Sequence, residues 1–429
     1  MAATPLTSIG IVGGGQLALM LAEAASELGI ALHLQTPSAT DPAARLAASV
    51  IEAPLEDVAA TRQLAERCGA ISFENEWVPR EALAPLVADG VRFVPSLEAL
   101  APLLAKRSQR ELLDRLHLPS PRWCGLEATL EPPEPADSAE SPQASQPSPF
   151  WQGGRPFQPA DASTISRTLT PALPPGFRFP VIAKASRGGY DGKATLRIAD
   201  QDGLERLLER VVPADWILEE CVAFERELAI VACRDREGSV VCYPLVETHQ
   251  HGQVCDWVQF PASVNHAVEA LARNIAASLL TALDYVGVLA IELFLGPAGL
   301  QINEIAPRTH NSGHVTIEAC RCSQFAQQVR VVAGLPMGLP DPVVPGALMV
   351  NLLGPSPGFD PEEEGRRLEA LRSLRDAHLH WYGKTGRAPG RKLGHLTLLR
   401  DQQSQAGGDA ERDRLLAEVR HHWPLPPLA

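Results

Sequence analysis

The segment QINEIAPRTHNSGH, residues 301–314, carries an acid, an amide, a fixed cation and two imidazoles close together. An apolar run at residues 286–295 precedes it, and a Gly-Pro-Ala-Gly sequence at residues 296–299 lies between the two. Glycine and proline in so short a connection favour a turn. The pattern therefore predicts a β-hairpin with one strand at 288–295 and a second strand at 300–305.

This hairpin would bring two carboxylates together. If Leu295 pairs with Gln301, Glu292 lies directly opposite Glu304, and the Cβ atoms of such a pair are roughly 5 Å apart. Two acids that close repel each other unless a cation lies between them, and hard oxygen ligands without Cys or His suit Mg²⁺. A register slip of one residue would turn Glu304 to the other face. We therefore expect the two acids to bind a metal, followed along the chain by Arg308.

The composition is that of a globular protein with several domains. Its 429 residues predict roughly two to four domains. The net charge of −13 argues against a nucleic-acid or anionic-membrane surface. The 8 cysteines show no CxxC spacing, which favours free thiols in a reducing cytoplasm. No signal peptide and no apolar stretch of membrane-spanning length is expected.

The chain opens with a βαβ pattern. We expect a strand at Ser8–Val12, a glycine turn at Gly13–Gly15, a helix at Leu17–Gly29 and a strand at Ala31–Gln35. Backbone N–H groups at such a helix N-terminus favour an anion. Dinucleotide binding is disfavoured, because Leu17–Ala18 stands where a third glycine is needed and no acid ends the second strand. A plain tight turn or a phosphate contact from another ligand remains.

Two further segments carry candidate ligand groups. The sequence AISFENEW at residues 70–77 ends a strand with Glu74 and Glu76, at an edge where open α/β sheets bind ligands. The strand Pro180–Lys184 ends in a cation and leads into ASRGGYDGKAT at residues 185–195. Glycine N–H groups with flanking positive charge suit a polyphosphate, so this loop is a candidate phosphate cover.

The rest of the chain divides into an insert and a C-terminal part. Residues 131–175 are rich in proline, serine and glutamine and are expected to be a disordered insert. Near the C-terminus, Lys384, Arg387, Arg391 and Lys392 form a basic set in an acidic protein, which suggests a site for a phosphate monoester. Periodicity also predicts strands at 240–246 and 347–353, helices at 262–283, 317–332 and 415–423, and an acidic turn at 362–364.

Taken in this order, the segments resemble the ATP-grasp enzymes, and among them the N5-carboxyaminoimidazole ribonucleotide synthases of purine biosynthesis. The resemblance covers nearly the whole chain except the insert. Its glycine loop and metal acids occur in many ATP-grasp ligases, whereas the HNSGH and GRKLGH motifs are narrower. The matching residues are Gly13–Leu17, Lys184 with Gly188–Gly192, Glu292, Asn303–Glu304, Ala306–Arg308, His310–His314 and His380–Leu396.

The resemblance implies an α/β (α+β) ATP-grasp fold. The expected parts are a Rossmann-like pre-grasp domain at 1–104, a helical connection at 105–126, the insert at 127–178, a lid at 179–245, a catalytic subdomain at 246–339 and a β-rich C-terminal domain at 340–429. The implied reaction is the ATP- and bicarbonate-dependent carboxylation of 5-aminoimidazole ribonucleotide through carboxyphosphate. ATP and Mg²⁺, or Mn²⁺, would be needed, and a cytoplasmic homodimer without nucleic-acid or membrane partners is implied.

The resemblance also implies residue roles. The catalytic group would be Arg308, His310, Asn311 and Ser312, and the metal acids Glu292 and Glu304. ATP would meet Lys106, Lys184, Gly189, Tyr190, Asp191, Gly192, Lys193, Ala194, Thr195, Glu219, Glu220, Cys221, Val222, Glu227, His249, Asn303 and Glu304. The acceptor nucleotide would meet Gly15, Gln16, Leu17, Glu76, Lys384, Arg391 and Lys392. The choices between His249 and His251 and between Glu74 and Glu76 stay open. Ala306 replaces an Asn common in other ATP-grasp enzymes, so waters or phosphates would complete the metal coordination.

Two alternatives have different consequences. Another ATP-grasp ligase, such as a formate-dependent glycinamide ribonucleotide transformylase or a biotin carboxylase, would keep the fold but change the acceptor. Neither explains the C-terminal basic set as well. A catalytically inactive nucleotide-binding regulator is the third possibility, and the intact Glu292, Glu304, Lys184 and Arg308 argue against it.

Overall fold

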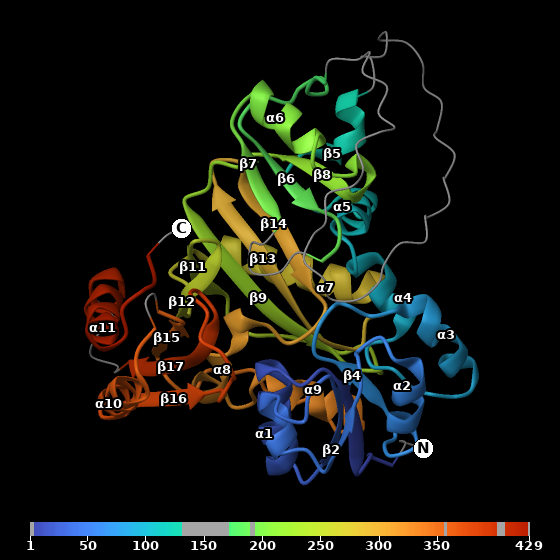
Figure 1. Ribbon diagram of the computed structural model, residues 1–429, viewed down its shortest axis with the longest axis vertical. Coiled ribbons are helices and arrows are strands. Elements are labelled where there is room, and N and C mark those ends of the chain that lie inside the picture. The colour runs from blue at the N-terminus through green and yellow to red at the C-terminus, as the bar shows by residue number, and fades with distance from the viewer. Residues whose placement is uncertain (1–3, 131–170, 189–193, 356–357, 401–407, 428–429) are drawn as a thin grey trace. The chain divides into compact units, whose positions relative to one another are not determined.

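The computed structural model describes residues 4–130, 171–188, 194–355, 358–400 and 408–427 (Figure 1). The chain forms two compact units. Unit 1 contains residues 1–104, 112–119 and 223–429, and unit 2 contains residues 105–111 and 120–222. The expected insert lies mostly outside the described residues.

The N-terminal part of unit 1 is built on a parallel four-stranded sheet of order β3-β2-β1-β4. Its strands are β1 (Ser8–Val12), β2 (Ala31–Thr36), β3 (Ser49–Glu52) and β4 (Ile71–Phe73). The helices here are α1 (Gln16–Glu27), α2 (Val58–Ala65), α3 (Arg80–Ala88) and α4 (Leu97–Leu100). The predicted βαβ opening is confirmed, and α1 is followed by Gly29 in the left-handed conformation, with φ of 68°.

A nine-stranded sheet forms the larger part of unit 1. Eight strands follow the order β14-β13-β9-β11-β12-β15-β17-β16, and β10 pairs with β9. The strands are β9 (Arg226–Arg234), β10 (Val240–Cys242), β11 (Val246–His251), β12 (Val254–Phe260), β13 (Gly287–Gly296), β14 (Gly299–Ala306), β15 (Gly346–Leu353), β16 (Ala377–Trp381) and β17 (Lys392–Arg400). Neighbouring strands pair antiparallel throughout.

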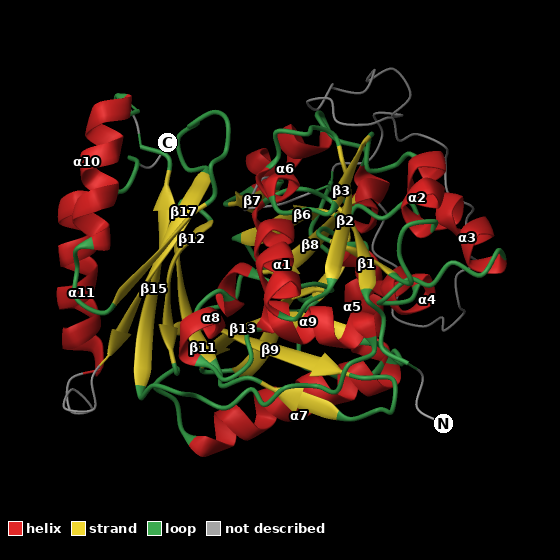
Figure 2. Cartoon of the chain, turned by 90° about the horizontal axis from the view of Figure 1, so that it is seen from below, coloured by secondary structure: helices red, strands yellow, loops and turns green. Residues whose placement is uncertain are grey.

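Helices cover this sheet. They are α7 (His266–Ala282), α8 (Thr316–Ala319), α9 (Gln324–Ala333), α10 (Pro361–Arg372) and α11 (Gly408–His422). Figure 2 shows α10 and α11 along one side of β15 and β17, where Leu348, Leu396, Val419 and Trp423 form a buried apolar cluster. No helix in the described ranges combines the length and apolar character that a bilayer span requires.

Three expected elements differ from the structure. The strand at 240–246 is two strands, β10 and β11. The helix at 317–332 is two helices, because Ser323 accepts a hydrogen bond from Ala326 N and begins α9 anew. The acidic turn at 362–364 is the first turn of α10, which Asp360 caps through Glu363 N at 2.7 Å. Acidic side chains are favourable at that position because they face the positive end of the helix dipole.

Unit 2 is built on an antiparallel sheet of order β5-β8-β6-β7. Its strands are β5 (Trp123–Gly125), β6 (Val181–Ala185), β7 (Thr195–Ile198) and β8 (Trp216–Glu220), with the helix α6 (Gln201–Leu208) and the start of α5 (Lys106–Arg115). Leu126, Val181, Leu204 and Leu218 are in its apolar core. Residues 223–245, which the sequence analysis grouped with the lid, belong to unit 1.

Candidate active site

The hairpin β13–β14 places Glu292 opposite Glu304, as the sequence predicted. The expected pairing of Leu295 with Gln301 is wrong, because Leu295 pairs with Leu300 and Phe294 with Gln301. A β-bulge between Glu292 and Leu293 absorbs one extra residue of β14 and shifts the register. Without the bulge, the pairing near the turn would continue and Glu292 would face Asn303.

The extra residue, Asn303, is turned toward the acids. Its side-chain Nδ2 donates to Glu292 Oε2 at 3.3 Å. On the other side of Glu292, His310 Nε2 lies 3.5 Å from Oε1. Within the described ranges, no three His, Cys, Asp or Glu residues are arranged to hold a metal. Two carboxylates fit Mg²⁺, which typically takes one or two from the protein and completes its shell with waters and substrate phosphates.

Arg308 is joined to Glu76, which is distant in sequence. Arg308 Nε donates to Glu76 Oε2 at 2.6 Å and its Nη2 donates to Oε1 at 3.1 Å, so the pair is bidentate. Burial alone would lower the pKa of Arg308, but Glu76, with Glu304 and Glu74, raises it above the usual value. Arg308 is therefore a permanent cation close enough to Glu304 to interact with its charge, and Glu76 is the acid of the FENE segment that pairs with it.

Glu74 has a different role. Its Oε2 accepts a hydrogen bond from Gly15 N at 2.7 Å, and its Oε1 accepts from Leu17 N and Ala18 N at 3.2 and 3.3 Å. Gly13, with φ of 120°, is needed because a Cβ there would lie 2.5 Å from Glu74 Cβ. Burial raises the pKa of Glu74, while these three N–H groups and Arg308 lower it. The anion position at the start of α1 is thus taken by the chain's own carboxylate.

The loop after Arg308 is held by Gln324, which is fully buried on α9. His310 N donates to Gln324 Oε1 at 2.9 Å, and Gln324 Nε2 donates to His310 O at 2.6 Å. His310 Nδ1 accepts from Ser312 N at 3.3 Å and lies 2.9 Å from Ser312 Oγ. In the neutral ring the proton is then on Nε2, the nitrogen that faces Glu292.

Asn311, the fourth predicted catalytic residue, is directed elsewhere. Its side-chain amide forms two reciprocal hydrogen bonds with the amide of Asn351 on β15, at 3.0 and 2.7 Å. Both residues are buried. His310 thus lies beside Glu292 and is held by Ser312, and Arg308 is paired with Glu76. The Asn311 amide instead packs against the C-terminal sheet.

In unit 2, Lys184 lies within a buried ion cluster. Glu219 Oε2 lies 2.7 Å from Lys184 Nζ, and Arg110 Nε donates to Glu219 Oε1 at 2.7 Å. Burial raises the pKa of Glu219, but Lys184 and Arg110 outweigh it and lower the pKa to about 2. The Glu219 side chain is therefore internal, and an adenine contact from this strand would come from its backbone or from Glu220–Val222.

Other residues predicted for ATP are placed as follows. Lys106 N donates to Ser186 O at 2.8 Å at the start of α5, and Ala194 and Thr195 lead into β7. Residues 189–193 lie outside the described ranges. In unit 1, Glu227 pairs with Thr248 across β9 and β11, and burial raises its pKa while His249 lowers it.

The two histidines of β11 have different surroundings. His249 Nδ1 lies 3.5 Å from Asp256 Oδ2, and its ring stacks on Trp257 at 5.3 Å between centroids. His251 Nε2 lies 2.8 Å from Pro426 O, so it is engaged by the C-terminal segment. His249, beside Glu227, is the better candidate for a nucleotide contact.

The predicted phosphate-monoester residues gather around the start of β17. Lys384 Nζ donates to Lys392 O at 2.8 Å, and Arg391 Nη1 donates to Gly386 O at 3.2 Å. Arg387 is engaged by Glu364, with Nη2 2.6 Å from Oε1. Arg387 belongs to the basic set that suggested a phosphate site, but this ion pair gives it a structural role instead.

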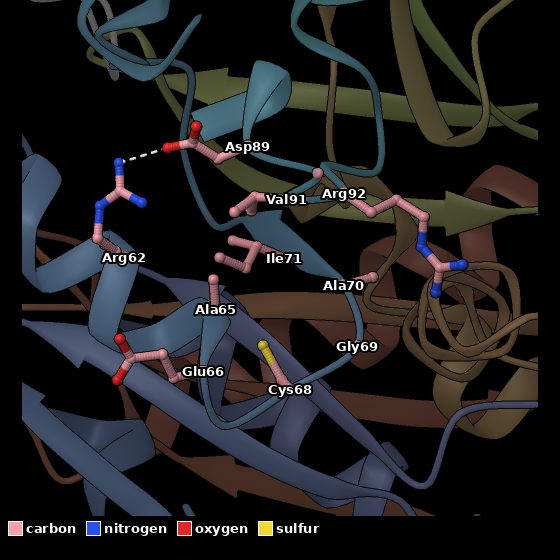
Figure 3. Close-up of a pocket in the computed structure, with 11 residues that line it drawn as sticks. Arg62, Ala65, Glu66, Cys68, Gly69, Ala70, Ile71, Asp89, Val91 and Arg92 are labelled. Atoms are coloured by element: carbon pink, nitrogen blue, oxygen red, sulfur yellow. Dashed lines mark hydrogen bonds and ion pairs between the residues drawn. The ribbon is translucent and has the colours of Figure 1, made fainter. Parts of the chain in front are cut away.

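A separate cavity of about 300 Å³ lies on the N-terminal sheet (Figure 3). Its lining includes Cys68, Ile71 and Val91, and Arg62 pairs with Asp89 at 2.7 Å on its rim. None of the predicted site residues lines it, so it is not part of the candidate site.

Sequence reasoning missed Gln324, Asn351 and Arg110, which hold functional side chains in place. Each contacts a residue far along the chain, so no local spacing identifies it. The three glutamines of α9, Gln324, Gln327 and Gln328, are all buried, and buried amides require partners, so this cluster in the sequence was the available signal.

Comparison with known proteins supports the assignment of the fold. Residues 6–103 match the ribonucleotide synthetase preATP-grasp domain, residues 163–325 the ATP-grasp domain, and residues 347–408 the phosphoribosylaminoimidazole carboxylase C-terminal domain. These matches confirm the expected ATP-grasp fold class.

Relatives match over the full length. The N5-carboxyaminoimidazole ribonucleotide synthase of Synechococcus elongatus is 41% identical over 431 residues, covering 100% of this chain and 98% of the relative. That of Synechocystis is 40% identical, covering 98% and 99%. The Aspergillus clavatus synthase, solved with ADP and 5-aminoimidazole ribonucleotide, is 27% identical with a TM-score of 0.76, covering 98% and 100%. The chain therefore belongs to the N5-carboxyaminoimidazole ribonucleotide synthase family.

Proposed function

We propose that this protein carboxylates 5-aminoimidazole ribonucleotide with bicarbonate at the expense of ATP. The observation that carries the proposal is the cluster of Glu292, Glu304, His310 and the Arg308–Glu76 pair. It combines a two-carboxylate metal set with a permanent cation and a proton-bearing imidazole. The names of the full-length relatives agree with this activity.

The reaction has two steps. The terminal phosphoryl group of ATP is transferred to a bicarbonate oxygen, which yields carboxyphosphate and ADP. The exocyclic amine of the imidazole nucleotide then attacks the carboxyl carbon, phosphate leaves, and the amine loses a proton. Carboxyphosphate is labile in water, so the site must bring both substrates together before water reacts with it.

Residues of the chain would supply positive charge and orientation. Lys106, Lys184 and the segment 189–195 would contact the ATP phosphates. Glu220–Val222, Glu227 and His249 would contact the adenosine part. Glu292 and Glu304 would hold Mg²⁺, which when bound would offset negative charge on the phosphates. His310 donates from Nε2 to an oxygen of bicarbonate or phosphate, because Ser312 engages its other nitrogen.

The acceptor nucleotide would be bound through its phosphate by Lys384, Arg391 and Lys392. Gly15, Gln16 and Leu17 lie beside Glu74, while Glu76 orients Arg308 toward the acceptor. We further propose that the protein is cytoplasmic, which its eight free thiols support. We also propose that it is a homodimer, which the family resemblance supports and which sedimentation would test.

The experiment measures ADP release and the transfer of ¹³C from labelled bicarbonate. We expect ADP release only when 5-aminoimidazole ribonucleotide is present, and ¹³C-labelled carbamate should form in the same reaction. Equal ADP release with glycinamide ribonucleotide and formate, or with biotin, would show that the acceptor is wrong. ATP binding without any turnover would favour a regulator instead.

A further inference from the structure

Two histidines of the family-specific motifs, His314 of HNSGH and His395 of GRKLGH, have no role in the proposed chemistry. Both are fully buried in unit 1. They belong to a set of six polar residues, here called the polar ladder, in which one row from the loop region meets one row from the sheet. The loop row is Asn311, His314 and Glu318, and the sheet row is Asn351, His395 and His380.

The geometry of both rows follows from their secondary structure. On the sheet, His395 of β17 pairs with Asn351 of β15 on one side and His380 of β16 on the other. Directly paired residues share a face, so the three side chains stand in a line across the strands. In the loop row the spacing is three and then four residues, which aligns side chains on one face of the helical turns at 311–313 and α8.

Each loop residue meets one sheet residue. Asn311 and Asn351 exchange two hydrogen bonds at 3.0 and 2.7 Å. The ring centroids of His314 and His395 lie 4.9 Å apart. His380 Nε2 lies 2.6 Å from Glu318 Oε1, and the His380 ring stacks on His395 at 4.4 Å. Tyr382 OH and His395 Nδ1 are 2.8 Å apart, so His395 is also held by a residue outside the ladder.

The middle rung is costly for stability. Neither ring nitrogen of His314 has a hydrogen-bond partner among the described residues, and the same holds for His395 Nε2 and Glu318 Oε2. Unpartnered buried polar atoms destabilise a fold and call for an explanation. An apolar side chain at 314 would avoid this cost. Stability alone therefore does not account for a histidine at this position.

We propose that the polar ladder is a registry device, in which His314, His395, Asn311 and Asn351 are positioning residues for the acceptor nucleotide. In the loop row, Asn311 lies between His310 and Ser312 in the sequence, and His314 follows them. In the sheet row, His395 belongs to β17, which begins at Lys392. The ladder thus fixes the imidazole-bearing loop relative to the basic end that would hold the nucleotide phosphate. This inference rests on the proposed function.

Directional contacts suit such a task better than apolar ones. Apolar packing is non-directional and tolerates sliding, whereas paired amides and an imidazole–carboxylate contact allow one alignment. Asn311 accordingly acts through the loop and does not touch the reacting atoms. This reassigns it from the predicted catalytic group.

The test compares His314→Leu and Asn351→Asp with His378→Leu. His378 is an exposed residue of β16 outside the ladder, and it serves as the matched control. Steady-state kinetics give kcat and the KM for each substrate, and thermal unfolding gives Tm. For His314→Leu we expect an unchanged or higher Tm, with kcat/KM for the imidazole nucleotide at least about tenfold lower and KM for ATP nearly unchanged. The control should change none of these.

Asn351→Asp keeps the volume but removes two donor contacts, to Asn311 Oδ1 and to Cys255 O. It should show the same selective loss, so the inference remains testable if His314→Leu does not fold. Unchanged kinetics in either folded variant, or equal losses for ATP and the imidazole nucleotide, would overturn the inference.

Amide hydrogen exchange separates this inference from the proposed function. In both variants, exchange of residues 309–318 should rise at least about tenfold relative to the wild type, while the β13–β14 hairpin is unaffected. If the wild type fails to use the imidazole nucleotide, the proposed function is wrong, and this exchange measurement still decides the ladder. Unchanged exchange in residues 309–318 would overturn the inference.

Discussion

Glu76 and Arg308 are 232 positions apart in sequence and form a bidentate ion pair, with Arg308 Nε 2.6 Å from Glu76 Oε2. The pair connects the segment after the N-terminal sheet to the residues that follow the β13–β14 hairpin. It also orients a guanidinium whose pKa the charges of Glu304 and Glu74 raise as well.

Replacing Glu76 with Gln should lower both stability and activity. The neutral amide leaves the buried guanidinium with less compensation, which costs about 1–3 kcal/mol of unfolding free energy. Because Arg308 would also lose its fixed orientation, kcat should fall by roughly a hundredfold. Denaturant unfolding and ADP release measure the two effects. Glu81→Gln, at an exposed carboxylate near Glu76, is the control, and equal activity in both variants would contradict the role of Glu76.

Replacing Glu304 with Gln should abolish turnover through loss of metal binding. One carboxylate of the facing pair is removed while the hairpin and its bulge are kept, so folding should be little affected. We expect kcat to fall by at least about a hundredfold and the Mg²⁺ concentration for half-maximal activity to rise. Glu237→Gln, in the exposed turn after β9, is the control. Retained activity in saturating Mg²⁺ would count against Glu304 as a metal ligand.

Replacing Glu219 with Gln should destabilise unit 2. The variant leaves Lys184 and Arg110 buried without their shared carboxylate, which costs about 3–5 kcal/mol. Since the folded pKa of Glu219 is lowered from 4.5 to about 2, its contribution is present above pH 4.5 and is lost as the pH falls toward 2. Hydrogen exchange of β6 and β8 against pH measures this contribution.

The Glu219→Gln variant should lack that acid-dependent step. Glu209→Gln, at an exposed carboxylate after α6, should keep it. A wild-type protein whose β6 and β8 protection does not change between pH 4.5 and 2 would speak against the ion cluster.

The polar ladder should make the protein acid-sensitive. Burial, with Lys392, His310, His380 and Arg308 nearby, lowers the pKa of His314 well below 6.5, and burial with His380 and His314 does the same for His395. The unfolded chain then binds more protons than the folded one below pH 6.5, so stability falls as the pH drops through that value.

The measurement is Tm from pH 7.5 to 5. His314→Leu should show a shallower decline than the wild type, because one buried imidazole no longer resists protonation. His378→Leu should follow the wild-type slope. Parallel slopes for His314→Leu and the wild type would exclude His314 as a source of the acid sensitivity.

Local patterns were sufficient for part of the fold. The βαβ opening and the facing acids of the hairpin both follow from spacing within a few residues. The break between α8 and α9 was missed because the apolar periodicity continues across Cys320. Local spacing does not indicate tertiary contacts. The hydrogen bonds of Glu74 to the start of α1, those of Gln324 to His310, and the pairing of Asn311 with Asn351 therefore could not be predicted.

Because of the bulge in β14, the number of residues after the turn does not by itself give the position of Glu304, the acid that faces Glu292. A homologue with one residue more or fewer before the bulge could keep both acids in place by moving the irregular position. An alignment of such hairpins by their glycine turns would match Asn303 of one chain with the position of Glu304 in the other. An alignment by Glu292 and its cross-strand partner would keep the acids matched.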